Sequence, residues 1–191
     1  EEDMESVFVE TGTFFGHGVV SALAKGAREI HSIEINRAHF QAAKLKLIFL
    51  GVTNPNIPVR TISKPDFFSI ELNNYARINL YLGDSALVLP SVIDDITKKT
   101  TFWLDAHWGP DVGVDLGAGP TPEQIFPVFK EIEAISEHSI PHHTIMIDDI
   151  HQFENVYPEG LPRLENKIRD INRDYKIEKR QKSIHDGGEI L

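Results

Sequence analysis

Acidic side chains follow two short apolar runs of the sequence. Thr101–Leu104 (TFWL) leads directly into Asp105, and Thr144–Ile147 (TIMI) leads directly into Asp148 and Asp149. If both runs are neighbouring parallel strands, their carboxyl ends meet at one edge of a sheet, and the three carboxylates share a crevice. Carboxylates packed together repel one another unless a cation or a proton relieves them. A magnesium ion held by carboxylates and waters would provide that relief.

A metal-free interpretation of the same residues stays open. Asp often caps a helix, so Asp149 is also explained as the N-cap of a following helix, with Asp105 near a reaction centre that holds no ion. His107 and His151 each come two residues after an acidic position. Because an imidazole can accept a hydroxyl proton near neutral pH, we favour His107 as a general base, with Asp105 as its rival. The alternative is a surface or supporting role, since the chain contains nine histidines.

A glycine-containing segment follows the first apolar run, and residues 10–18 read ETGTFFGHG. Glycines let the backbone turn sharply and approach a ligand closely. Glu34 lies at the end of the second predicted strand, roughly 20 residues beyond the glycines, where an acid suits the hydroxyls of a ribose. A ligand-free turn and a solvated strand end would explain either feature alone. Their order on successive elements favours a ligand that contains a nucleoside.

Two aromatic residues limit the kind of nucleoside. Phe14 and Phe15 lie between Gly12 and Gly16. A dinucleotide site needs closely spaced glycines so that a helix N-terminus can meet the pyrophosphate. The two bulky side chains make that approach unfavourable, and a nicotinamide-dependent oxidoreductase becomes the alternative rather than the preferred interpretation.

The surrounding pattern predicts an α/β domain in which a doubly wound, mostly parallel sheet has helices on both faces. The predicted strands are Ser6–Glu10, Glu29–Ile35, Ile78–Leu82, Thr101–Leu104, Thr144–Ile147, Tyr175–Gln181 and Glu189–Leu191. The predicted helices are Gly16–Lys25, Arg37–Leu50 ending at Gly51, Ala86–Ile96, Pro122–Glu137 and Leu164–Arg173. Two long stretches, Val52–Arg77 and Trp108–Thr121, are interpreted as inserted loops.

The composition limits the class of partner. The chain has 191 residues, 41% of them hydrophobic, and a formal net charge of −10. Such a charge repels phosphate backbones, so no nucleic acid partner is expected, and no apolar run approaches the roughly 20 residues that cross a bilayer. The chain has no cysteine, which excludes thiolate chemistry and fits a reducing, cytoplasmic location. We expect residues 1–191 to be a single domain excised from a longer chain, with no signal for an oligomeric state.

The glycine segment resembles the first motif of class I S-adenosylmethionine-dependent methyltransferases, which has the form acid-x-Gly-x-x-x-Gly-x-Gly. Glu10, Gly12, Gly16 and Gly18 fit this form. The resemblance implies a Rossmann-like, seven-stranded sheet that ends in a C-terminal antiparallel hairpin, here within Tyr175–Leu191. It also implies S-adenosylmethionine as the cofactor.

Further positions match the same family. Its members place an acid after the second strand for the ribose hydroxyls, and many carry an Asp after the third strand near the adenine amino group; Glu34 and Asp84 match these. The resemblance therefore implies a cofactor site made by Glu10, Gly12, Thr13, Gly16, Glu34, Asp84 and Ser85.

The acidic clusters resemble those of metal-dependent O-methyltransferases of the macrocin O-methyltransferase type, which act on sugar hydroxyls. The resemblance implies that Asp105, Asp148 and Asp149 bind Mg²⁺, and that the acceptor is a small molecule or glycan with a free hydroxyl. A non-catalytic domain within a larger protein is a second alternative, and an activity assay would decide it.

Overall fold

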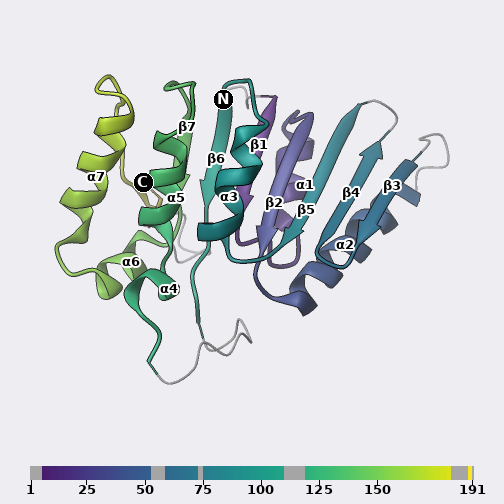
Figure 1. Cartoon of the computed structure of the whole chain (residues 1–191), viewed down its shortest axis with the longest axis horizontal. Helices are drawn as coiled ribbons and strands as arrows, with labels where there is room; N and C mark the ends of the chain where they lie inside the picture. Colours follow the sequence, from purple (N-terminus) through teal and green to yellow (C-terminus); the bar gives the residue numbers. More distant parts are fainter. Residues whose placement is uncertain (1–5, 53–58, 73–74, 110–118, 182–188, 191) are drawn as a thin grey trace.

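A seven-stranded sheet runs through the centre of the protein in the computed structural model, which describes residues 6–52, 59–72, 75–109, 119–181 and 189–190 (Figure 1). The strands are β1 (Val7–Thr11), β2 (Glu29–Glu34), β3 (Val59–Lys64), β4 (Phe67–Leu72), β5 (Ala76–Leu82), β6 (Thr100–Leu104) and β7 (Thr144–Ile147). Their order is β3-β4-β5-β2-β1-β6-β7, and every pair from β5 to β7 is parallel. The predicted α/β, mostly parallel, Rossmann-like sheet is confirmed.

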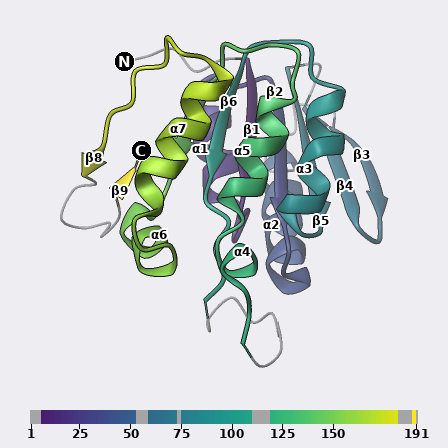
Figure 2. The same ribbon diagram turned by 60° about the vertical axis from the view of Figure 1, so that its left-hand side comes forward.

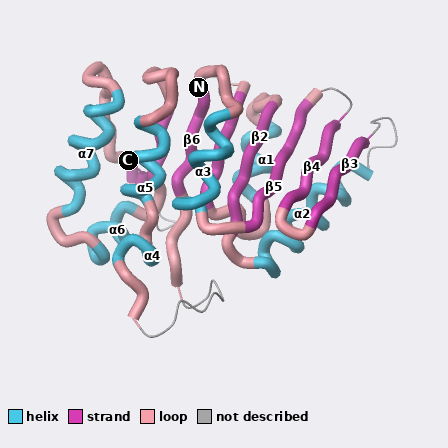
Figure 3. The backbone as a smooth tube through the Cα atoms, in the orientation of Figure 1, coloured by secondary structure: helices cyan, strands magenta, loops and turns pink. Residues whose placement is uncertain are grey.

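Helices cover both faces of the sheet (Figures 1 and 3). They are α1 (His17–Ala24), α2 (Arg37–Val52), α3 (Ser85–Asp94), α4 (Pro122–Ile125), α5 (Val128–Ser136), α6 (Ile150–Val156) and α7 (Gly160–Ile171). Helices α3, α5 and α7 pack on one face around the larger apolar core, whereas α1 and α2 pack on the other around the smaller one. None of these helices is long and apolar enough to span a bilayer.

The parallel register aligns the strand ends that the site needs. Thr11 pairs with Leu104, and Leu104 pairs with Ile147, so β1, β6 and β7 end at the same level. Glu34 and Leu82 pair at the ends of β2 and β5. All five residues of β1 are buried, as expected for a central strand covered on both faces. The loops that leave these strands therefore open on one edge of the sheet.

The segment predicted as the inserted loop Val52–Arg77 contains two strands. Strands β3 and β4 form an antiparallel hairpin that joins the sheet through β5. Phe68 and Ile70 alternate toward the core, and Pro65-Asp66 makes the turn between the strands. Strand β3 lacked a sequence signal because it lies at the edge of the sheet and is exposed from Arg60 to Lys64.

The chain end also differs from the expectation. Of the predicted strand Tyr175–Gln181, only β8 (Arg180–Gln181) forms, and it pairs antiparallel with β9 (Glu189–Ile190). This pair is a separate two-stranded sheet beside α7 and α6 (Figure 2), so it does not extend the seven-stranded sheet. The antiparallel hairpin of the seven-stranded sheet is instead β3-β4, which pairs with β5 and forms one edge of the sheet.

Two helix predictions need correction. The predicted helix Pro122–Glu137 is divided into α4 and α5, because Pro127 disfavours a helical conformation in Phe126, whose φ and ψ are −140° and 92°. Helix α2 does not end before Gly51 but continues to Val52. A Cβ at Gly51 would lie 3.2 Å from side-chain atoms of Val59 and Ile70, so the glycine lets the β3-β4 hairpin pack closely against the helix.

A pair of histidines joins two loops at the opposite edge of the sheet. His138 Nε2 donates to the Ile96 carbonyl, so its Nδ1 accepts from His143 Nε2 at 2.9 Å. His143 Nδ1 in turn accepts from the Thr100 N–H. Every nitrogen is used by the neutral form of each ring, and an added proton would break one of these bonds. Burial, with a smaller contribution from His138, lowers the pKa of His143 to about 4.

This arrangement predicts a loss of stability in mild acid. The folded-state pKa of His143 lies below its unfolded value, so its contribution is complete above about pH 6.5 and is lost as the pH falls toward 4. We expect a loss on the order of 2 kcal/mol between pH 7 and pH 4.5, measured by urea unfolding. His143→Gln should lack this component, whereas His142→Gln, at an exposed position, should keep it. Equal pH profiles for the two variants would contradict the assignment.

Candidate functional site

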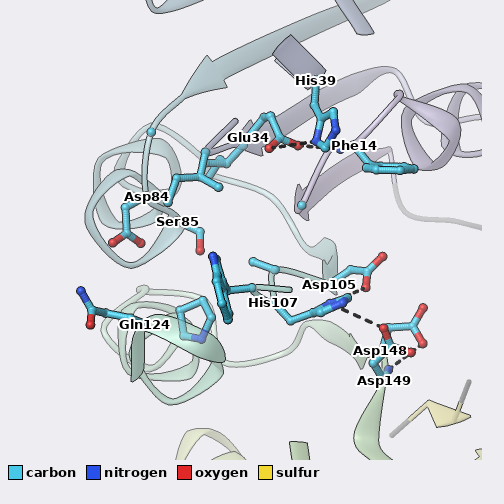
Figure 4. A pocket seen from close by; sticks show the side chains of 17 residues that line it. Phe14, Glu34, His39, Asp84, Ser85, Asp105, His107, Gln124, Asp148 and Asp149 are labelled. Carbon is cyan, nitrogen blue, oxygen red and sulfur yellow. Dashed lines mark hydrogen bonds and ion pairs between the residues drawn. The ribbon is translucent and has the colours of Figure 1, made fainter. Parts of the chain in front are cut away.

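A cavity of about 380 Å³ opens at the carboxyl ends of the parallel strands (Figure 4). Its walls come from the loops after β1, β2, β5, β6 and β7 and from α4. It is lined by Gly12, Phe14, Ile33, Glu34, Ile35, His39, Gly83, Asp84, Ser85, Asp105, Ala106, His107, Trp108, Gln124, Pro127, Asp148 and Asp149. The structure thus brings most of the predicted site residues together in one cavity.

The glycine turn forms one wall. Gly12 has a φ of 82°, and its N–H donates to the Ile33 carbonyl. A Cβ at Gly12 would lie 2.6 Å from the Asp105 carbonyl oxygen, so the strand ends of β1 and β6 approach each other only because this residue has no side chain. Phe14 follows with a φ of 48°, a left-handed conformation unusual for an aromatic residue. Phe14 lines the cavity, and its ring contacts those of Phe15 and His39.

The carboxylate of Glu34 lies at the end of β2, where it organises the same wall. It accepts hydrogen bonds from the Phe14 N–H at 2.6 Å and from the Asn36 N–H at 2.7 Å. Burial raises the pKa of Glu34, and these backbone donors partly offset that effect. His39 lies 3.9 Å from the same carboxylate (Figure 4). Each oxygen of Glu34 keeps a second lone pair, so the residue can still accept bonds from two vicinal hydroxyls.

Asp84 and Ser85 line the cavity at the start of α3. Asp84 is the N-cap of this helix, and its Oδ1 accepts from the Ala86 N–H at 2.9 Å. Ser85 is the first residue of the helix and is 5% exposed. Because the capping bond holds its carboxylate, Asp84 has a fixed orientation that suits a polar contact with the heterocyclic ring of a bound ligand.

Three of the predicted cofactor residues lie behind the wall rather than in it. Thr13 donates to the Ser32 hydroxyl, which donates to Glu10 Oε2 at 2.6 Å. Burial, above all other causes, raises the pKa of Glu10 to about 8. Gly16 is the left-handed residue that begins α1, and a Cβ at Gly18 would overlap the Glu10 carboxyl group. These residues support the glycine turn and do not line the cavity.

An acidic cluster occupies the other end of the cavity. One potential ligand atom each of Asp105, His107 and Asp149 lies within 4.8 Å of the other two. His107 Nδ1 is 3.5 Å from Asp149 Oδ2 and 3.9 Å from Asp105 Oδ1. Asp148 also lines the cavity but is only 3% exposed, and its Oδ1 accepts from the Asp149 N–H. Among the described residues, the gathered set therefore contains His107 where the resemblance implied Asp148.

The backbone explains which of the two adjacent aspartates joins the cluster. Asp149 has a φ of 53° and is the N-cap residue of α6, but its side chain makes no capping hydrogen bond with the helix. Its left-handed conformation leaves its side chain beside His107 (Figure 4). His107 Nδ1 is buried and has no hydrogen-bond partner among the described residues. His151 is exposed on α6 and does not line the cavity, so it is separated from this cluster.

Sequence reasoning missed several residues of the cavity. His39 and Gln124 come from helices that were interpreted as core or covering elements, and their side chains reach the cavity only through the packing of α2 and α4. A weak signal existed for His39, because it lies in the first turn of the helix that follows Glu34. Gln124 belongs to a capping box with Thr121, which explains the position of α4.

The charge of the cavity is distinctive. Five carboxylates line it, from Glu34, Asp84, Asp105, Asp148 and Asp149, and no Lys or Arg is present among its described lining residues. A site of this charge attracts cations and disfavours phosphate groups.

The close approach at Gly12 gives a testable prediction. Gly12→Ala adds a Cβ against the Asp105 carbonyl and places Ala at a positive φ, so we expect about 2–4 kcal/mol of destabilisation. Gly26→Ala is the matched control, because Gly26 also has a positive φ of 103° but nothing lies within 4 Å of its Cβ position. It should cost only about 1–2 kcal/mol in urea unfolding. Equal losses of stability in the two variants would show that the contact with the Asp105 carbonyl adds nothing to the cost of the Gly12 substitution.

Comparisons with known proteins identify the fold. No protein-family model matches the chain, and no curated protein sequence matches it. Among solved structures, it is similar to a Streptococcus mutans protein assigned as a methyltransferase, in complex with SAH (TM-score 0.55, 12% identity, covering 98% of this chain and 87% of that one). It is also similar to an O-methyltransferase from Bacillus cereus in complex with SAH (TM-score 0.54, 15% identity, 97% and 72%). A Klebsiella pneumoniae protein assigned as an O-methyltransferase gives a TM-score of 0.52 at 14% identity, with coverage of 97% and 71%. The chain therefore has the fold of the class I S-adenosylmethionine-dependent methyltransferases.

Proposed function

We propose that the protein transfers a methyl group from S-adenosylmethionine to a hydroxyl oxygen, and that the acceptor is a neutral molecule such as a sugar. The observation that carries the proposal is a single cavity with two chemically different ends. One end has the Gly12 turn, Glu34 and Asp84, which suit a nucleoside. The other has the Asp105, His107 and Asp149 cluster, which suits a reacting hydroxyl.

The charge of the cavity favours this donor over a dinucleotide. S-adenosylmethionine carries a positive sulfonium and no phosphate, whereas a nicotinamide dinucleotide brings an anionic pyrophosphate. Five carboxylates without a lining Lys or Arg stabilise the first and repel the second. The same argument favours an acceptor without phosphate groups.

The reaction is an in-line displacement. The acceptor oxygen attacks the methyl carbon opposite the sulfur, so that a C–O bond forms as the C–S bond breaks. The sulfonium becomes the neutral thioether of S-adenosylhomocysteine, and the hydroxyl proton passes to a base. Asp105 and His107 lie at the acceptor end of the cavity and are the candidates for this base. Holding donor and acceptor in line is the larger part of the catalysis.

We further propose that Asp105, His107 and Asp149 hold a divalent ion, Mg²⁺ or Mn²⁺. Their potential ligand atoms are close enough for one ion, and the buried, unbonded Nδ1 of His107 faces the two carboxylates. When bound, the ion lowers the pKa of a coordinated hydroxyl and orients it. With His107 Nδ1 as a ligand, Asp105 and His107 both support the ion, and the proton leaves to solvent or to a neighbouring carboxylate such as Asp148.

Donor binding is tested by calorimetry at pH 7.5. We expect S-adenosylmethionine and S-adenosylhomocysteine to bind with micromolar dissociation constants, and NAD⁺ to give no heat at the same concentrations. Binding of NAD⁺ in place of both would transfer support to the oxidoreductase alternative. A folded protein that binds neither methyl-donor compound would end the proposal.

Metal binding is tested without reference to turnover. Titration of Mn²⁺ into the protein, followed by the electron paramagnetic resonance signal of the free ion, should reveal one site. Asp149→Asn should weaken it by at least tenfold, because a charged ligand is lost. Asp94→Asn, at an exposed carboxylate on α3, is the control and should change nothing. Equal affinity of both variants would refute the assignment of the ligands.

A further inference from the structure

A buried carboxyl group next to Ser85, a residue that lines the cavity, has no assigned role. Glu131, on α5, is 1% exposed. Neither of its oxygens makes a hydrogen bond of standard geometry with the described residues. Leaving a buried carboxyl group unsatisfied is costly, so a residue of this kind calls for an explanation.

The surroundings of Glu131 connect it with both ends of the cavity. The hydroxyls of Ser85 and Thr11 lie near enough to favour the charged form of the carboxyl group. Ser85 lines the cavity beside Asp84. Thr11 ends β1, and its Oγ1 accepts from the Asp105 N–H at 3.3 Å, so its own hydroxyl proton is available for another acceptor. Glu131 therefore lies where it can accept from Ser85 and Thr11 at once.

We propose that Glu131 is a positioning residue that fixes the direction of the Ser85 hydroxyl and thereby selects adenine as the base of the bound nucleoside. This inference rests on the proposed binding of S-adenosylmethionine. When the carboxylate accepts the Ser85 proton, the lone pairs of Ser85 Oγ face the cavity. They can then accept from an amino group, as in adenine, and they oppose a carbonyl oxygen at the same position, as in hypoxanthine.

The protonation of Glu131 gives this selection a pH dependence. The pKa of Glu131 is raised to about 7. Burial is the largest cause, the hydroxyls of Ser85 and Thr11 act in the opposite direction, and the Asp84 carboxylate adds to the increase. The carboxyl group is charged above that pH, so the preference for adenine should increase between pH 6 and pH 8. Burial also raises the pKa of Glu34, but this carboxylate lies where the ribose is proposed to bind, and the ribose is the same in both ligands, so the ratio of the two affinities cancels its effect.

The test measures the dissociation constants of S-adenosylhomocysteine and of its hypoxanthine analogue, S-inosylhomocysteine. In the wild type we expect the adenine compound to bind at least tenfold more tightly at pH 8. Glu131→Gln should reduce this preference about tenfold and remove its pH dependence, because the neutral amide can donate to Ser85 and reverse its hydroxyl. Glu133→Gln is the matched control on the same helix, since Glu133 is exposed and pairs with Lys130 at 2.8 Å.

Ser85→Ala provides a second variant that does not depend on the folding of Glu131→Gln. It should lose the same preference, and combining the two changes should cause no further loss. Full preference in either single variant overturns the inference while leaving the proposed function intact. Absence of S-adenosylhomocysteine binding in the wild type would overturn the proposed function itself, and this inference with it.

Discussion

Replacement of Glu34 by Gln should weaken S-adenosylhomocysteine binding by at least 100-fold. The carboxylate accepts from the Phe14 and Asn36 N–H groups through different oxygens, and the amide offers only one acceptor oxygen. One backbone donor would then face an NH₂ group, and a ribose hydroxyl would lose a charged acceptor. Each hydrogen bond to a charged group contributes about 1.5–3 kcal/mol. The lost bond to the ribose and the disturbed bond to the backbone should therefore each weaken binding more than tenfold.

The control for this variant lies on the same strand. Glu29 is at the other end of β2, where it contacts His31 rather than the cavity. Glu29→Gln should therefore leave the dissociation constant unchanged within threefold in calorimetry. Thermal unfolding of both variants separates a binding defect from a loss of folding. If Glu34→Gln bound S-adenosylhomocysteine as tightly as Glu29→Gln, the ribose would have to contact another residue.

Replacement of Asp105 by Asn should lower kcat by about 10²–10⁴ while donor affinity changes little. Asp105 lies at the acceptor end, 3.9 Å from His107 Nδ1, and Asn keeps its shape but neither its charge nor its basicity. The range is that of losing a general base, and losing a metal ligand has an effect of similar direction. The proposed donor site lies at the opposite end of the cavity, so the dissociation constant of S-adenosylhomocysteine should stay within threefold.

A companion variant separates the two roles at this end. His107→Gln should also reduce kcat, and it should weaken Mn²⁺ binding if Nδ1 is a ligand. A defect in kcat with unchanged Mn²⁺ affinity would favour His107 as the base. An Asp105→Asn enzyme with wild-type turnover would remove the acidic cluster from the chemistry altogether. The assay follows the formation of S-adenosylhomocysteine with a panel of neutral polyhydroxyl acceptors.

The parts of the fold that could be predicted from sequence are those whose pattern reports burial. Strand β1 is buried along its whole length and contains the apolar run Val7–Val9, and β2 contains the β-branched residues Ile30 and Ile33. Strand β3 is exposed along most of its length and carries no such pattern, so the β3-β4 hairpin was interpreted as a loop. The break between α4 and α5 had a local cause in Pro127, which the helical spacing of apolar residues around it obscured.

The candidate site divides in the same way. Glu34, Asp84 and Asp105 could be predicted because each lies at the carboxyl end of a strand or within two residues of it, and the topology of a parallel sheet determines where such residues lie. The choice between Asp148 and Asp149 depends on the left-handed backbone at Asp149, which no sequence pattern signals. Glu131 could not be predicted from the sequence, because it lies within a helix and approaches Ser85 and Thr11 only through tertiary packing.

The left-handed residues of the cavity bear on how this protein could change under selection. Phe14 and Asp149, with φ of 48° and 53°, both line the cavity, and each conformation costs on the order of 1 kcal/mol for a residue with a side chain. Glycine at either position would relieve that cost and delete a side chain of the site. Selection for heat resistance alone would thus favour changes that erode function, and thermostable variants chosen without an activity screen should accumulate substitutions at these two positions.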